Sequence, residues 1–243
     1  MRKPAMILFD YGNTLLHEPG IDFLRGEEEV FRHLTANPRQ VTVQEAYAFG
    51  VRLFRDADSC RRNGWELHEY QLLQLKYDSL GLSFDVPLPE IERILWTATS
   101  PGEKMPGVEA MLSDLWARGI RTGVISNIGW SGQALAERIN RLLPENHFEF
   151  IVASSEYGVR KPNPLLLSLA LTKAGLNPCD VWYCGDSISA DVCGAQAAGM
   201  FPVFYESAEV ENPFAHKNAR QIIEGEHLHI RRWRELAQVL NTL

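Results

Sequence analysis

Short apolar runs alternate with longer amphipathic stretches over much of the chain. The short runs are apolar or β-branched and are bounded by turn residues, so they predict β-strands. They lie at residues 5–10, 121–126, 150–154, 180–184, 201–205 and 227–230. Helical periodicity occurs in residues 106–119, 132–143, 163–175 and 188–199, and each stretch ends near a glycine or proline. This alternation predicts an α/β fold with a doubly wound, mainly parallel sheet that helices cover on both faces.

Residues 17–100 have a different pattern, with charged amphipathic stretches and no convincing strand. Helices are predicted at residues 25–37, 41–60, 66–81 and 88–99, with Thr42 in the N-cap region of the second. We therefore expect two parts. Residues 1–16 and 101–243 would form the α/β core, and residues 17–100 would form a helical insert that follows the first strand.

The overall composition narrows the class of protein. The chain has 243 residues, 45% of them apolar and 23% charged, which is enough to bury a sizeable core. A formal charge of -7 and a pI near 5.5 argue against a broad nucleic-acid surface, because such surfaces accumulate Lys and Arg. Nothing in the sequence identifies a protein partner or an oligomeric state.

The N-terminus and the cysteines bear on location. The apolar run before Asp10 is too short for a signal peptide or a membrane span, so we expect a cytoplasmic protein without a membrane partner. The four cysteines have no C-x-x-C spacing and are too sparse for a disulfide framework. They are predicted to be reduced and buried.

Polar residues follow several of the predicted strands. Asp10 ends the first strand, Ser126 and Asn127 end "RTGVISN", Lys161 lies in "YGVRKPNP", and Asp186 follows "VWYCG". Ligands of open parallel sheets bind at the carboxyl ends of the strands, so these groups are expected to share one site.

Together these groups suit phosphoryl transfer. Asp10 could be a nucleophile that forms an acyl-phosphate. Asp186 could bind Mg2+ with it, and Asp191, one helical turn further on, could orient Asp186 or a bound water. Lys161 would neutralise the nucleophile and the phosphate, and the Ser126 hydroxyl would hold a phosphoryl oxygen.

With these motifs the sequence resembles the haloacid dehalogenase-like (HAD) superfamily of hydrolases. "FDYGNTL", "VISN", "RKPNP" and "GDSISAD" resemble the four family motifs, in order and at plausible spacing over nearly the whole chain. The resemblance implies a Rossmann-like catalytic core, and the insert after the first motif resembles a C1-type cap domain. A small phosphorylated substrate and Mg2+ are likewise implied.

Carried over by position, the resemblance gives each residue a role. Asp10 would be the nucleophile, and Lys161 would stabilise charge. Ser126, Asn127, Thr14 and Lys161 would contact the substrate. The metal ligands would be Asp10, the backbone carbonyl of Gly12, and Asp186, with support from Asp191.

The chain departs from the family pattern at Gly12. Family phosphatases generally carry a second Asp there, which acts as general acid and base. Such catalysis contributes roughly 10²–10⁴-fold, so its loss predicts slow hydrolysis or a preference for leaving groups of low pKa. His17, Arg61 and Arg62 are candidate substitutes on the insert side.

Ordinary structural explanations exist for single residues of the set. Asp10 could cap a turn, Lys161 could be a solvated loop charge, and Asp186 could be a helix N-cap. Trp65, between two predicted helices, is expected to pack against helix ends, with closure over the substrate as the alternative.

Two alternatives to a phosphatase stay open. One is a protein that binds a phosphorylated ligand without catalysis, since fold does not fix function, and Gly12 favours it. The other is a C–halogen hydrolase of the dehalogenase type, which also lacks the second Asp but needs no Mg2+.

Overall fold

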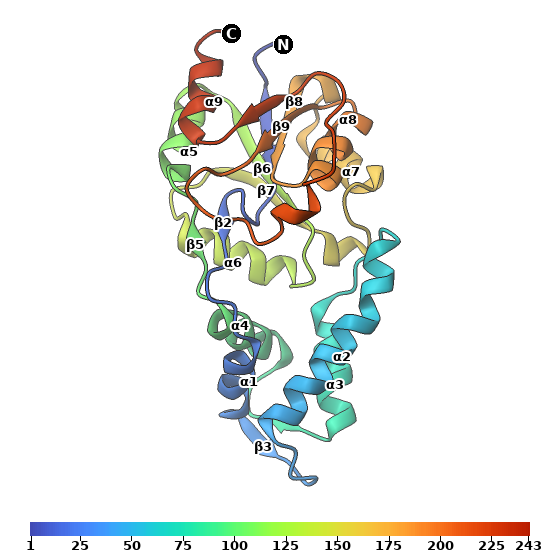
Figure 1. Ribbon diagram of the computed structural model, residues 1–243. Coiled ribbons are helices and arrows are strands. Elements are labelled where there is room, and N and C mark those ends of the chain that lie inside the picture. Colours follow the sequence, from blue (N-terminus) through green and yellow to red (C-terminus); the bar gives the residue numbers. More distant parts are fainter.

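The computed structural model describes residues 1–243, with a six-stranded sheet at its centre (Figure 1). In spatial order the strands are β10 (Leu228–Ile230), β9 (Phe201–Tyr205), β8 (Val181–Gly185), β1 (Met6–Phe9), β6 (Arg121–Ser126) and β7 (Phe148–Ala153). Every pairing between neighbours is parallel. The six predicted strands and the α/β class are confirmed.

Helices cover both faces of this sheet. The helices α5 (Val108–Ala117), α6 (Gly132–Leu142) and α9 (Trp233–Leu240) share one apolar cluster with it, and α7 (Pro164–Ala174) and α8 (Cys193–Ala197) share the other. In β1, Ile7 and Phe9 belong to the first cluster, whereas Met6 and Leu8 belong to the second. Because alternate side chains are buried on opposite faces, the strand reads as a continuous apolar run.

The insert contains four helices with an apolar cluster of their own. They are α1 (Phe23–Phe31), α2 (Val43–Arg62), α3 (Glu69–Leu80) and α4 (Leu88–Thr99). Thr42 is the N-cap of α2 and forms a capping box with Glu45, which satisfies backbone N–H groups at the helix start. All four predicted helices are present.

The prediction that the insert has no strand is wrong. The first helix ends at Phe31, and β3 (Leu34–Ala36) pairs antiparallel with β4 (Ser83–Phe84). These strands are too short to show alternation in the sequence, and their pairing joins segments far apart in the chain.

The insert leaves and re-enters the core through a second small sheet. Strand β2 (Leu16–His17) pairs antiparallel with β5 (Glu103–Lys104). Figure 1 shows the insert beyond the carboxyl ends of the central strands, with both chain termini at the opposite end of the molecule. The insert therefore lies on the side of the sheet where ligands are expected.

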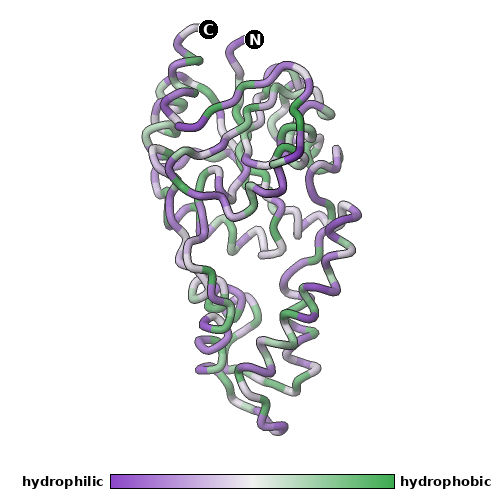
Figure 2. Tube along the Cα trace, viewed as in Figure 1, coloured by the Kyte–Doolittle hydropathy of each residue, from purple (hydrophilic) through white to green (hydrophobic).

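Hydropathy differs between the two parts (Figure 2). Hydrophobic stretches run through the central strands, whereas hydrophobic and hydrophilic positions alternate along the helices of the insert. No helix combines the length and the apolarity that a membrane span requires.

The prediction that the cysteines are reduced and buried is only partly confirmed. All four are free thiols, but only Cys184 is buried, whereas Cys179 and Cys193 are exposed. The expectation of burial is wrong for those two because both lie near helix ends, outside the packed faces of the sheet.

Candidate active site at the carboxyl edge of the sheet

Three of the candidate residues come from three adjacent strands. Asp10 directly follows β1, and its N–H donates to the Cys184 carbonyl at 2.9 Å, which extends the pairing with β8. Ser126 is the last residue of β6, and Asp186 is the first residue after β8. Since β8, β1 and β6 are neighbours, these three residues lie at the middle of the carboxyl edge.

Lys161 reaches this point from the loop between β7 and α7. Its residue is 3% exposed, and its Nζ donates to Asp10 Oδ1 at 2.6 Å and to Asp191 Oδ1 at 2.7 Å. It also contacts the Tyr183 hydroxyl at 2.6 Å, and that hydroxyl donates to the Ile125 carbonyl. One buried ammonium group therefore joins two of the three aspartates.

Asp191 is held at both carboxylate oxygens. Oδ1 accepts from Lys161, and Oδ2 accepts from the Ser187 backbone N–H at 2.9 Å. Its close approach to the strand end requires a glycine, because a Cβ at Gly185 would lie 2.3 Å from the Asp191 carboxylate. The "GDS" sequence therefore makes room for this carboxylate.

The acidic groups suit a divalent cation. Oxygen atoms of Asp10, Asp186 and Asp191 lie within 4.8 Å of one another. Lys161 contributes one positive charge to the cluster through its contacts with Asp10 and Asp191. When all three aspartates are ionised, the cluster therefore carries two negative charges in excess. Hard oxygen ligands with this excess charge match Mg2+.

Burial and mutual repulsion shift the pKa values of these carboxyls. Burial raises the pKa of Asp10 to about 6, although Lys161 opposes the shift. Burial, and then the charges of Asp10 and Asp191, raise the pKa of Asp186 to about 8. Burial lowers the pKa of Lys161, but the two aspartates outweigh it, so the pKa is raised and the ammonium stays charged. A metal ion would favour the ionised carboxylates.

Two other candidate residues have structural surroundings: Asn127 is half-buried and Thr14 is fully buried. The Asn127 amide accepts from the Lys161 N–H at 2.7 Å and donates to the Lys161 carbonyl at 2.8 Å, so it fixes the backbone of the lysine. Thr14 is completely buried, and its hydroxyl has no partner within the chain.

The position of Gly12 is open. A Cβ built there would meet no atom within 4 Å. The site could therefore accommodate a larger residue at position 12.

Comparison with known proteins agrees with this geometry. Residues 97–204 match the family described as haloacid dehalogenase-like hydrolase. The chain is 26% identical over 221 residues to a glyceraldehyde 3-phosphate phosphatase of Methanothermobacter thermautotrophicus, an alignment covering 89% of this chain and 92% of that one. The chain is therefore similar to haloacid dehalogenase-like hydrolases, as the four motifs predicted.

Solved structures of HAD proteins share the fold. A HAD phosphatase from Thermococcus onnurineus superposes with a TM-score of 0.63 at 20% identity, covering 98% of each chain. A 2-haloacid dehalogenase from Pseudomonas syringae gives 0.61 at 20% identity, covering 100% of this chain and 99% of that one. Phosphatase and dehalogenase thus have this architecture in common, and the fold alone does not choose between them.

The insert contacts the core next to the loop that carries Lys161. Glu66 is buried and accepts from the Ser154 hydroxyl at 2.9 Å, while Arg61 and Arg160 lie 3.3 and 3.2 Å from its carboxylate. The Glu66 N–H donates to the Gly158 carbonyl at 2.9 Å. The insert is therefore attached to the loop that carries Lys161.

Trp65 contradicts its predicted role in packing. Its backbone pairs with Val159, and the residue is 58% exposed. The alternative, a loop that closes over the site, is compatible with this position.

The candidate substitutes for the missing acid each lie next to a carboxylate. His17 lies 3.6 Å from Glu103, and the exposed Arg62 lies 2.9 Å from Asp58. Arg61 is held by Glu66.

Sequence reasoning missed several residues of the site. Tyr183 looked like an ordinary strand residue, yet its hydroxyl contacts Lys161. Asn212 and Asn218 contact Asp186 and belong to no motif. Nothing in their local pattern distinguishes them from turn residues, because only the path of the folded chain brings them to the site.

Proposed function

We propose that this protein is a Mg2+-dependent HAD phosphohydrolase that acts on a small phosphorylated metabolite through an aspartyl-phosphate on Asp10. The observation that carries the proposal is the bridge from Lys161 to Asp10 and Asp191, with Asp186 in the same cluster. Buried charges of this number are costly unless they serve a ligand, and a divalent metal ion would balance the two excess negative charges.

In the first step, an oxygen of Asp10 attacks phosphorus and the bond from phosphorus to the leaving oxygen breaks. The leaving oxygen takes a proton from water, and Asp10 then carries the phosphoryl group. In the second step, water attacks phosphorus and gives up a proton to solvent, the bond from phosphorus to Asp10 breaks to restore the carboxylate, and inorganic phosphate is released. A pKa of about 6 leaves Asp10 mostly ionised at neutral pH, as a nucleophile requires.

The surrounding residues would stabilise this chemistry. Lys161 stays protonated and neutralises Asp10 and the phosphoryl oxygens, while the Ser126 hydroxyl holds one of those oxygens. Asp10, Asp186 and the Gly12 carbonyl would hold Mg2+, with Asp191 in support. When bound, Mg2+ supplies positive charge against the phosphoryl group.

We further propose that the substrate has a leaving group of low pKa. Gly12 provides no proton donor, and such groups, as in acyl or aryl phosphates, depart without one. The relative from Methanothermobacter thermautotrophicus is named for glyceraldehyde 3-phosphate, so triose phosphates belong in the first substrate panel.

Hydrolysis of p-nitrophenyl phosphate and acetyl phosphate, with and without Mg2+, tests the proposal. We expect turnover that requires Mg2+ and is lost in Asp10→Asn. A series of esters with graded leaving-group pKa should show a steep dependence of rate, and a flat dependence would contradict the role assigned to Gly12. Turnover that survives both EDTA and Asp10→Asn would remove the phosphatase mechanism.

A second candidate is a ligand-binding protein without catalysis, which the empty position at Gly12 favours. It predicts no hydrolysis of either substrate, but retained binding of phosphate. Formation of a BeF3- adduct on Asp10 together with turnover would exclude it. Chloride release from a 2-haloacid without metal would instead indicate dehalogenase chemistry.

A further inference from the structure

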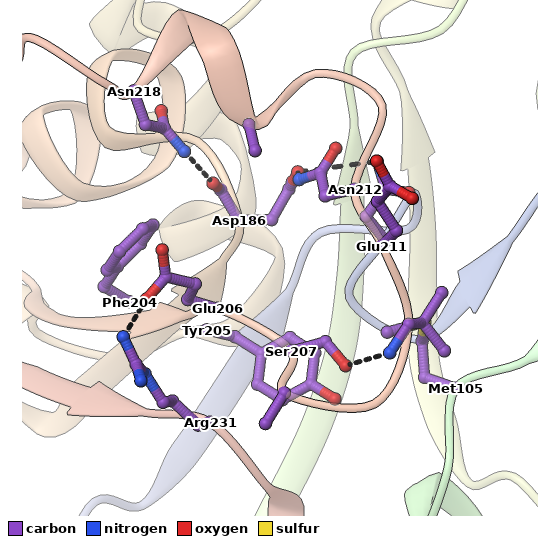
Figure 3. Close-up of a pocket in the computed structure, with 14 residues that line it drawn as sticks. Met105, Asp186, Phe204, Tyr205, Glu206, Ser207, Glu211, Asn212, Asn218 and Arg231 are labelled. Atoms are coloured by element: carbon purple, nitrogen blue, oxygen red, sulfur yellow. Dashed lines mark hydrogen bonds and ion pairs between the residues drawn. The ribbon is translucent and has the colours of Figure 1, made fainter.

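The residues between β9 and β10 form a wall beside the acidic cluster. This segment, residues 206–227, has little regular structure and lies beyond the stretch that matches the family. This segment lines a cavity of about 270 Å3 together with Asn13 and Met105. Asp186 is also one of the residues that line the cavity. Figure 3 shows Asn212 and Asn218 grouped around Asp186, with Glu206 and Arg231 paired at another side.

Asn212 contacts the carboxylate directly. Its Nδ2 donates to Asp186 Oδ2 at 2.6 Å, and its Oδ1 accepts from the Phe214 N–H at 2.8 Å. The second contact closes a turn that fixes the amide, so the donor points at Asp186. Asn13 Nδ2 lies 3.5 Å from the same Oδ2. Both amides therefore face one oxygen and leave Oδ1 of Asp186 for another partner.

Asn218 holds the backbone of the same residue. Its Nδ2 donates to the Asp186 carbonyl at 2.8 Å, and its Oδ1 accepts from the Ile188 N–H at 3.0 Å. The segment thus fixes Asp186 at two places, side chain and main chain. Asp186 needs this support more than the other aspartates do, because it is the least buried of the three.

We infer that Asn212 is a positioning residue for the metal ion, which orients the Asp186 carboxylate so that Oδ1 faces the ion. The inference rests on the proposed function, because it assumes that Asp186 binds Mg2+. Groups that orient metal ligands typically change metal affinity by 10–100-fold when they are removed. We therefore expect Asn212→Ala to weaken Mg2+ binding about 10-fold or more, with little change in the KM for substrate at saturating Mg2+.

Isothermal titration of Mg2+ into the substrate-free protein measures this affinity without turnover. The matched control is Ser207→Ala. Ser207 accepts from the N–H groups of Glu209 and Val210, so its loss loosens the same segment without touching Asp186. If Asn212→Ala fails to fold, Asn212→Ser replaces it, because a serine hydroxyl can still accept from Phe214 but is too short to reach Asp186.

Each outcome has a distinct meaning. Weaker Mg2+ binding in the Asn212 variant, with the Ser207 variant like wild type, supports the inference. Equal affinity in the Asn212 variant and wild type, or an equal loss in the Ser207 variant, overturns it while the proposed function stands. Absence of Mg2+ binding to the wild-type protein overturns both.

Discussion

Two positions near Asp10, Lys161 and Gly12, are built in contrasting ways. Lys161 is almost completely buried and meets Asp10, Asp191 and Tyr183, each at 2.6 or 2.7 Å. At Gly12, by contrast, a Cβ would meet no atom within 4 Å outside the glycine and its two chain neighbours. The charge-stabilising part of the site is therefore fixed in advance, whereas the position for a proton donor is empty.

This contrast suggests that the site provides charge stabilisation but no proton transfer. Preorganised charge stabilisation is usually the largest single contribution to catalysis, and proton transfer adds a smaller factor. A site that keeps the first and lacks the second should still break bonds to good leaving groups. The predictions below test each side of this comparison.

Loss of Lys161 should have the largest effect. In Lys161→Ala, Asp10 and Asp191 lose the ammonium that they share, and breaking a buried pair in this way costs about 3–5 kcal/mol. Turnover of p-nitrophenyl phosphate should fall at least about 10²–10³-fold, as when a preorganised donor is removed. Urea unfolding and steady-state kinetics measure the two effects, with the exposed Lys173→Ala as control. Wild-type turnover in Lys161→Ala would show that the buried cation is not part of the chemistry.

Restoring an acid at Gly12 should have the opposite effect. Gly12→Asp places a carboxyl in open space, so the free energy of unfolding should change little. Hydrolysis of alkyl phosphates should rise about 10²-fold, the lower end of general acid catalysis, and that of p-nitrophenyl phosphate should rise less.

Gly12→Asn is the matched control, because it has the same size but cannot donate a proton as an acid. If both variants raise the rate equally, the gain comes from the presence of a side chain rather than from proton transfer. A gain as large for aryl as for alkyl phosphates would also contradict the assignment.

Much of this site could be predicted from sequence because it follows the sheet. Asp10, Ser126 and Asp186 each lie at a strand end, so a parallel sheet brings them to one edge. Tyr183 could not be assigned, because its hydroxyl reaches Lys161 only through the packing of the finished sheet. Asn212 could not be assigned because it reaches Asp186 from a segment without periodicity.

For the fold, too, local patterns could be predicted from the sequence, whereas long-range pairings could not. The long helices of the insert follow from periodicity, and the sequence correctly predicts Thr42 near the start of α2. Strands β3 and β4 were missed because pairing across many residues, rather than local pattern, forms them. The boundary of a cap domain at residues 17–100 stays a prediction.

The raised carboxyl pKa values predict a pH-dependent stability for the metal-free protein. The folded pKa values of Asp10, Glu69 and Asp186 are about 6, 7 and 8, above their ordinary values near 4, mainly because of burial. Between pH 4 and pH 8 the folded state therefore binds more protons than the unfolded state, and stability falls as pH rises. Mg2+ competes with those protons, so its stabilising effect should grow over the same range.

Thermal unfolding from pH 5 to pH 8.5, in EDTA and in Mg2+, measures both trends. Asp186→Asn should flatten the EDTA curve and raise the midpoint at pH 8 by roughly 3 °C, since 1 kcal/mol corresponds to about 2–4 °C at this chain length. It should also remove most of the Mg2+ effect. An EDTA midpoint that does not change with pH in wild type would contradict the pKa values.

The smallest expected effect concerns Trp65, at the contact between insert and core. Backbone bonds from Glu66 to Gly158 and from Arg160 to Gly64 place Trp65 next to the Lys161 loop, and its ring is exposed. If the loop closes when Mg2+ and BeF3- are added, the ring becomes more buried and its fluorescence emission should shift to the blue.

Trp65→Phe should abolish this shift while turnover of p-nitrophenyl phosphate changes less than about tenfold, because exposed side chains contribute little when replaced. The control is Trp116→Phe, since Trp116 is equally exposed but lies on α5, stacked on His147. A blue shift that persists in Trp65→Phe and disappears in Trp116→Phe would place the motion elsewhere. No shift in the wild-type protein, under conditions where turnover requires Mg2+, would mean that the insert is already closed before the ligand binds.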